Sequence, residues 1–309
     1  MAQTKEISRR IKSVTSTKKI TKAMEMVAAA KMRKAIEAVL KTRAYASLSW
    51  ETILRLAALE KSKNEESHPL LSARKEIKSA AVILITSNRG MCGGYNAAVI
   101  NKAEQSLKKY ATIKTEFILA GKKGATVHQH GHGVAAEFEK EDVLTEVSEI
   151  YPIIKLALSD YLNGKYDKVF VAYTDFINPA RQIPRVKQLL PVEIEKDETY
   201  LGAASVNIEE GIDKHHEAMS TAPVEYTFEP SPREVLDTMI PRLLEVQLYQ
   251  AFLEANASEH SARMTAMHQA TEAASDMVSE LTLFYNKARQ AGITAEIAEI
   301  SAGANALAE

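Results

Sequence analysis

Three glycines in the segment SNRGMCGGYN come closest of any residues in this chain to a phosphate-binding pattern. The segment follows a short apolar run and precedes a helical stretch, and phosphate loops occupy this position because backbone N–H groups at a helix start bind anions. Yet Gly90, Gly93 and Gly94 match neither G-x-G-x-x-G nor G-x-x-x-x-G-K-[ST]. We therefore predict a tight turn, and a nucleotide-dependent enzyme that uses the loop from Ser87 to Tyr95 is kept as an alternative.

The nucleophiles and metal-ligating residue types give weaker patterns. Cys92 has no neighbouring base in the sequence, so a nucleophilic role is not indicated. The residues His128, His130 and His132 alternate, but glycines separate them and no carboxylate or cysteine accompanies them, so a solvated loop is predicted. The sequence therefore predicts no catalytic residue, no metal site and no cofactor.

Charge is distributed unevenly along the chain, although its formal net value is only −1. Residues 1–43 contain twelve basic and three acidic side chains, whereas residues 232–309 contain five basic and eleven acidic ones. Opposite charges favour pairing of the two ends, and the basic excess near the N-terminus calls for an acidic partner. A coiled-coil scaffold that binds nucleic acid is a second alternative, without aromatic interleaving or a recognised reader motif to support it.

Two long helical segments must position these residues. Residues 1–61 carry apolar side chains at a spacing of three and four, and so do residues 232–304. We expect the two segments to pair as an antiparallel coiled coil. Because a helix rises 1.5 Å per residue, the second would be about 105 Å long and the first about 85 Å. The last ~20 residues would then extend alone beyond the N-terminus.

Between the helices, residues 77–215 alternate apolar strand patterns with helical ones. The runs AAVILIT, TEFILAG, KVFVAYTDF and RQIPRVKQLLPVE predict four strands, the last at a proline-containing edge. This alternation predicts a Rossmann-like three-layer α/β domain with a largely parallel sheet. The fold class is therefore α/β with a long coiled coil. A single cysteine excludes an intrachain disulfide and suits a reducing compartment.

Three longer blocks resemble the γ subunit of F-type ATP synthases. They are KKITKAMEMVAAAKMRKA, SNRGMCGGYN, and SEHSARMTAMHQAT with LTLFYNKARQAGITAEIAEISAGANAL. The resemblance, to the bacterial type, covers essentially the whole chain. It implies a non-catalytic central rotor shaft that couples ion flow through the membrane c-ring to conformational change at the β-subunit catalytic sites, in ATP synthesis and hydrolysis.

The resemblance also implies partners and contact residues. The expected partners are the α and β subunits, which form a hexamer around the helix pair, the ε subunit and the c-ring. Nucleic acid and direct membrane insertion are not expected, and the expected location is peripheral, on the cytoplasmic side of a bacterial cell membrane. Contact with β is implied for Met24, Arg263, Arg289, Gln290, Thr294 and Glu296, and contact with the c-ring for Tyr226, Phe228 and Glu229.

Overall fold

The computed structural model describes residues 2–62, 68–72, 74, 76–108, 113–192, 229 and 232–308. These residues fall into two compact units, and the helices α1 and α5 each contribute to both. Unit 1 comprises residues 1–29 and 263–309, and unit 2 comprises residues 30–262. Among the described residues, no helix combines the length and the apolar character needed to cross a membrane.

The elements follow the alternation that the sequence predicts. In chain order they are α1 (Ala2–Ser62), β1 (Ser79–Ile85), α2 (Tyr95–Leu107), β2 (Lys114–Ala120), η2 (Lys122–His130), β3 (Gly133–Phe138), η3 (Val147–Ile150), α3 (Tyr151–Leu162), β4 (Lys168–Asn178), β5 (Arg181–Leu190) and α5 (Pro232–Ala308). Both long helices begin where the sequence predicts, and they end within a few residues of the predicted positions.

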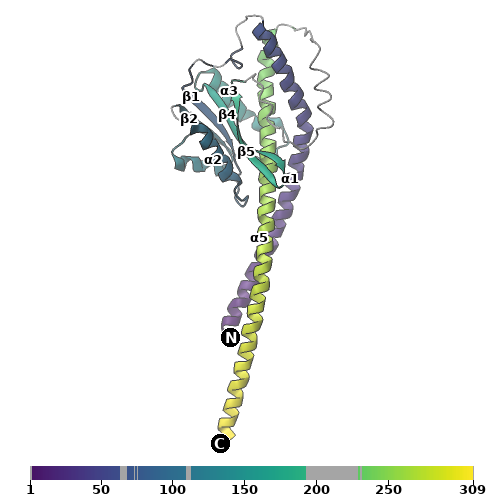
Figure 1. Cartoon of the computed structure of the whole chain (residues 1–309), viewed down its shortest axis with the longest axis vertical. Helices are drawn as coiled ribbons and strands as arrows, with labels where there is room; N and C mark the ends of the chain where they lie inside the picture. The colour runs from purple at the N-terminus through teal and green to yellow at the C-terminus, as the bar shows by residue number, and fades with distance from the viewer. Residues whose placement is uncertain are drawn as a thin grey trace. The chain divides into compact units, whose positions relative to one another are not determined.

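Unit 2 is built on a five-stranded sheet with the order β3-β2-β1-β4-β5 (Figure 1). The first four strands pair in parallel, and β5 pairs antiparallel with β4 at one edge. Pro184 lies in β5, where a missing N–H costs least because an edge strand pairs on one side only. The predicted largely parallel sheet with a proline-containing edge is therefore confirmed, and the edge strand β5 makes it mixed.

Helices cover both faces of this sheet. On one face Val99 and Ala103 of α2 pack against Val82 and Leu84 of β1 and Phe117 of β2. On the other face, the buried cluster combines side chains from α3, from α5 between Leu236 and Ala255, and Val39 from α1. Since every residue of α5 from 243 to 261 is buried, this part of the helix belongs to the domain core as well as to a helix pair.

The sequence did not predict β3. Its pattern GVAAEF lies at the edge and alternates exposed with half-buried positions, so no continuous apolar run marks it. The predicted solvated loop was also wrong in part, because His128 and His130 belong to the 3₁₀ segment η2. Two carboxylates accompany these imidazoles: His128 lies 3.1 Å from Glu137, and His130 lies 2.5 Å from Glu104. Among the described residues, no group of three such side chains could hold a metal ion.

Candidate functional site

The candidate site is the surface of unit 1, where the two helices run side by side (Figure 1). The contact between them is small and partly polar. Lys18 Nζ donates to Ser275 Oγ at 2.9 Å, and Thr271 Oγ1 donates to Thr21 Oγ1 at 2.8 Å. Lys18 interrupts the apolar row in the sequence, and its bond to Ser275 explains why a lysine is tolerated there. Among the residues of unit 1 whose burial the structure describes, only Ala28, Met267 and Ala274 are buried.

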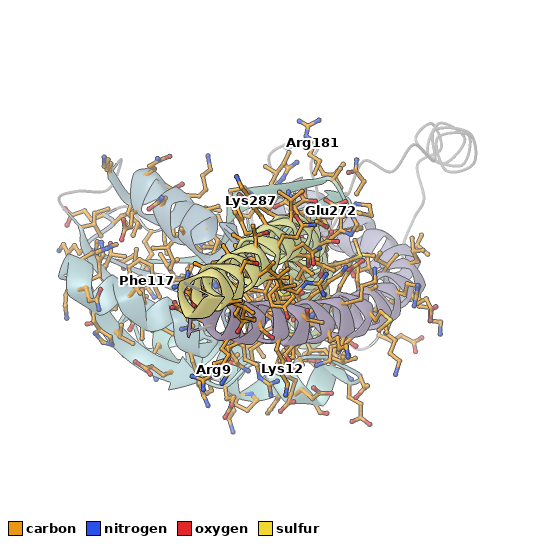
Figure 2. All side chains as sticks on the ribbon, turned by 90° about the horizontal axis from the view of Figure 1, so that it is seen from below. Arg9, Lys12, Phe117, Arg181, Glu272 and Lys287 are labelled. Carbon is orange, nitrogen blue, oxygen red and sulfur yellow. The ribbon has the colours of Figure 1, made fainter. Side chains whose placement is uncertain are left out.

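Basic side chains lie along the exposed side of α1 in this unit. Figure 2 shows Arg9 and Lys12 extending from the side of α1 that faces away from α5. Further along the helix, Lys22 pairs with Glu25 at 3.0 Å, and this hydrogen bond lowers the pKa of the Glu25 carboxyl. Lys19 is exposed as well. This side of α1 therefore presents positive charge to any acidic partner.

A groove of about 660 Å³ lies next to this basic surface. Its walls come from both helices, and its surface is more apolar than polar. It is lined by Thr15, Lys18, Lys19, Lys22, Ala23, Met26, His268, Thr271, Glu272 and Ser275. Met26 is 58% exposed and lines the groove together with three lysines, so the groove suits a partner segment that has both acidic and apolar side chains.

The structure locates the predicted β-contact residues, all six of which lie in unit 1. Met24 and Arg263 are half-buried, whereas Arg289, Gln290, Thr294 and Glu296 are exposed. The first two therefore belong to the helix pair, and the other four lie on the part of α5 beyond it. Of the predicted c-ring residues, Glu229 is exposed, and Tyr226 and Phe228 lie outside the described residues.

The end of α5 is the most exposed helical segment that the structure describes. Every residue from 289 to 304 is exposed, and within unit 1 this part of α5 continues past the N-terminus of α1 (Figure 1). Ile293, Ile297 and Ile300 share one helix face and are 49%, 60% and 71% exposed. Apolar residues at this spacing normally face a partner, and the described chain covers none of them.

The glycine-containing loop is an anchoring element of unit 2. The Ser87 N–H donates to Asn96 Oδ1 at 3.0 Å, and Asn96 Nδ2 donates back to Ser87 Oγ at 2.8 Å. The loop then attaches to α5, because Tyr95 Oη donates to the carbonyl of Ala255 at 3.2 Å. Met91 and Gly93 have φ values of 61° and 56°, which matches the predicted tight turn. Since Asn96 and Ser87 bond each other, the polar groups at the start of this loop are already occupied.

The block SEHSARMTAMHQAT has an anchoring role as well, which its sequence pattern did not reveal. Ser258 Oγ donates to the carbonyl of Thr174 at 3.0 Å, and His260 Nε2 donates to that of Asp142 at 2.8 Å. Asp142 in turn accepts a bond of 2.6 Å from Lys31 of α1. Burial opposes ionisation of Asp142, but the bond from Lys31 outweighs it and lowers the pKa of this carboxyl. The start of this block thus attaches α5 to the rest of unit 2, and Asp142 attaches α1 to the same place.

Comparisons with known proteins agree with this arrangement. The family model described as ATP synthase matches residues 3–307. The chain is 39% identical to the ATP synthase gamma chain of Chloroflexus aurantiacus, with 99% of both chains covered. It is 40% identical to that of Roseiflexus castenholzii over the whole of both chains, and 38% identical to that of Legionella pneumophila over 99% and 100%.

Solved structures with a similar fold include parts of mitochondrial ATP synthases. A chain from the rotational state 3 structure of Euglena gracilis matches with a TM-score of 0.62, at 16% identity, over 99% of this chain and 95% of that one. A chain from the central stalk and c-ring structure of Tetrahymena thermophila matches with a TM-score of 0.57, at 21% identity, over 81% and 99%. These two matches show the fold alone. On the strength of its full-length sequence relatives, the chain belongs to the ATP synthase gamma chain family.

Proposed function

We propose that this chain is the central rotor shaft of an F-type ATP synthase. In this role it couples ion flow through the membrane c-ring to conformational change at the β-subunit catalytic sites, during ATP synthesis and hydrolysis. The chain itself makes and breaks no covalent bond. Family membership over residues 3–307 supports the assignment. The observation that carries it is the exposed segment 289–304, whose isoleucine row needs a surrounding protein surface.

The two ends of unit 1 fit different parts of a surrounding α/β hexamer. The lysines at the groove and on α1 suit acidic segments of β. Met24 and Arg263 are half-buried residues of the same helix pair. Arg289, Gln290, Thr294 and Glu296 lie on one exposed helix, where a single β subunit at a time can reach them. Such a contact forms in one rotational position and breaks in the next, as coupling requires.

The domain of residues 77–215 would act as the foot of the shaft. It would contact the ε subunit and the c-ring, with Tyr226, Phe228 and Glu229 facing the polar loops of the ring. The helical segments 1–61 and 232–304 would form the shaft. The complex would then place this chain at the cytoplasmic face of a bacterial membrane, attached through the c-ring and not inserted.

Purification through an affinity tag on this chain in its own cells tests the assignment. We expect α, β, ε and c subunits to co-purify with ATPase activity. The Arg289→Ala, Gln290→Ala double variant should assemble the same subunits and lose most of the activity, since hydrogen bonds to charged partners contribute about 1.5–3 kcal/mol each. Tight binding of ATP or duplex DNA by the isolated chain, with no subunit captured, would contradict the proposal.

A further inference from the structure

Two carboxyl groups meet in the interior of unit 2. Asp175 of β4 is 2% exposed, and Glu254 of α5 is completely buried. Ser258, one turn beyond Glu254, donates to the carbonyl of Thr174, the neighbour of Asp175, and the two carboxyl groups shift each other's pKa. An ionised carboxylate can only accept hydrogen bonds, so a bond between two carboxyl groups requires a proton on one of them.

The unpaired oxygens of this pair show where the proton belongs. Asp175 Oδ1 and Glu254 Oε2 are both buried, and neither has a hydrogen-bond partner. The remaining oxygens are used: Asp175 Oδ2 lies 2.7 Å from Arg185 Nε, and Glu254 Oε1 accepts from Gln250 Nε2 at 3.5 Å. A single proton between Oδ1 and Oε2 would therefore satisfy both unpaired atoms at once.

The charges around the pair assign the proton to Glu254. From β5, Arg185 pairs directly with Asp175, and Lys187 acts on both carboxyl groups from farther away. From the two helices come only neutral partners, Gln250 of α5 and, behind it, Thr42 of α1, whose Oγ1 donates to Gln250 Oε1 at 2.7 Å. Asp175 thus has a cation in contact, and Glu254 has none among its described neighbours.

We propose that Asp175 and Glu254 form a proton-binding site that holds α5 against β4. In the bound state, Glu254 donates its proton to ionised Asp175, and the network links α1, α5, β4 and β5. Loss of the proton leaves two negative charges in contact inside the core, so the attachment of α5 to the sheet weakens. The site makes the stability of unit 2 depend on pH on the alkaline side.

The direction of the pKa shifts agrees with this geometry. Burial, and then the charge of Asp175, raise the pKa of Glu254 well above its ordinary value, and burial raises that of Asp175 as well. Between the ordinary and the raised pKa, the folded chain binds one proton more than the unfolded chain. Stability therefore falls as pH rises through that window, and the two groups titrate as a pair.

Infrared spectroscopy of the full chain at neutral pH tests the site, since protonated carboxyl groups absorb apart from carboxylates. We expect Glu254→Gln to remove one protonated-carboxyl signal, because the amide replaces the proton donor with an N–H group. The matched control Glu245→Gln, on the same helix but paired with Arg242 at 2.6 Å, should leave that signal unchanged. An unaltered spectrum in the Glu254 variant would overturn the proposal.

A calorimetric series from pH 6 to pH 9 provides the second readout. The wild-type melting temperature should fall with rising pH more steeply than that of Glu254→Gln, which should be as stable as wild type or more so. Asp175→Asn should be less stable than wild type at every pH, because it leaves Arg185 without its ion pair. A Glu254→Gln chain that is unfolded at neutral pH would show that the carboxylate itself is needed, and would overturn the assignment.

Discussion

Lys140 and Glu259 form an ion pair in which both side chains are almost fully buried, at 1% and 2% exposure. The Lys140 ammonium also donates to Asn256 Oδ1 at 2.8 Å, so it has two partners on consecutive turns of α5. Asn88 of the glycine-containing loop donates to the carbonyl of Lys140 from the other side. This lysine therefore connects α5, the segment after β3 and the glycine-containing loop.

Lys140→Met should destabilise the chain strongly, because it removes the ammonium group that pairs with the buried carboxyl group of Glu259. Breaking a buried ion pair in this way costs about 3–5 kcal/mol. Urea unfolding of the full chain measures the loss. The control is Lys122→Met, which removes an exposed pair with Glu139 and should cost no more than ~1 kcal/mol. Equal stabilities of the two variants would contradict a structural role for the buried pair.

Acid should weaken unit 2 through Asp167. Burial opposes ionisation of this carboxyl, but hydrogen bonds from the N–H groups of Lys78 and Ser79 and from Arg74 outweigh it and lower its pKa. A lowered carboxyl pKa gives stability that is present above the ordinary value and is lost as pH falls through the folded value. Thermal unfolding between pH 7 and pH 3 should show this loss, and Asp167→Asn should be less stable at pH 7 with a flatter dependence.

A wild-type chain whose stability stays level over that range would show that the bonds to Asp167 do not favour its charged form. Asp160→Asn is a suitable control, because Asp160 makes its side-chain contact with the more exposed Lys165 at 2.8 Å. That substitution should change stability by no more than ~1 kcal/mol.

Local patterns in the sequence were enough to predict most of the fold. The long helices and four of the five strands follow from apolar periodicity, since each buries a continuous stripe or run. Strand β3 was missed because its edge position leaves alternate residues exposed and the others only half-buried. The tertiary pairings could not be predicted, because a polar residue in the sequence does not show which distant residue it contacts. Lys140 and Glu259, for example, are separated by more than a hundred residues.

The exposed end of α5 in the candidate site could be predicted from the sequence pattern, whereas the individual contact residues could not. Helix lengths alone placed the end of α5 beyond the start of α1, and the exposed residues 289–304 agree with this. The individual contact residues came from family resemblance, and their roles stay predictions. The anchoring role of Ser258 and His260 had no signal in the sequence beyond the block that contains them.

Met24→Lys should weaken coupling without preventing assembly. Met24 is half-buried beside the groove, where a new ammonium group would join Lys18 and Lys22 against an acidic β segment and hold one rotational state too firmly. The ratio of ATP made to ions moved should fall in complexes of normal composition. Leu40→Lys is the control, since Leu40 is 50% exposed on the part of α1 that belongs to unit 2 and does not line the groove. An unchanged ratio in the Met24 variant would remove this residue from the coupling surface.

Deletion of the last ten residues should leave folding intact and reduce ATPase activity only in part. The deleted segment includes Ile300, which is 71% exposed, and its described side chains make no buried contact with the chain. The urea unfolding midpoint should match that of wild type. By contrast, Met267→Ala removes a buried side chain from the helix pair and should cost about 2–5 kcal/mol. A truncated chain that fails to fold would show that the end of α5 packs against its own body.

Rotation of single complexes tests the rotor assignment most directly. Lys102 is exposed on α2, and Cys92 is buried, so Lys102→Cys provides an accessible thiol for a bead while the native one is shielded. With the α/β hexamer fixed to a surface and ATP supplied, we expect the bead to turn continuously in one direction. A bead that stays still, or only fluctuates, on complexes that hydrolyse ATP at the normal rate would contradict the account.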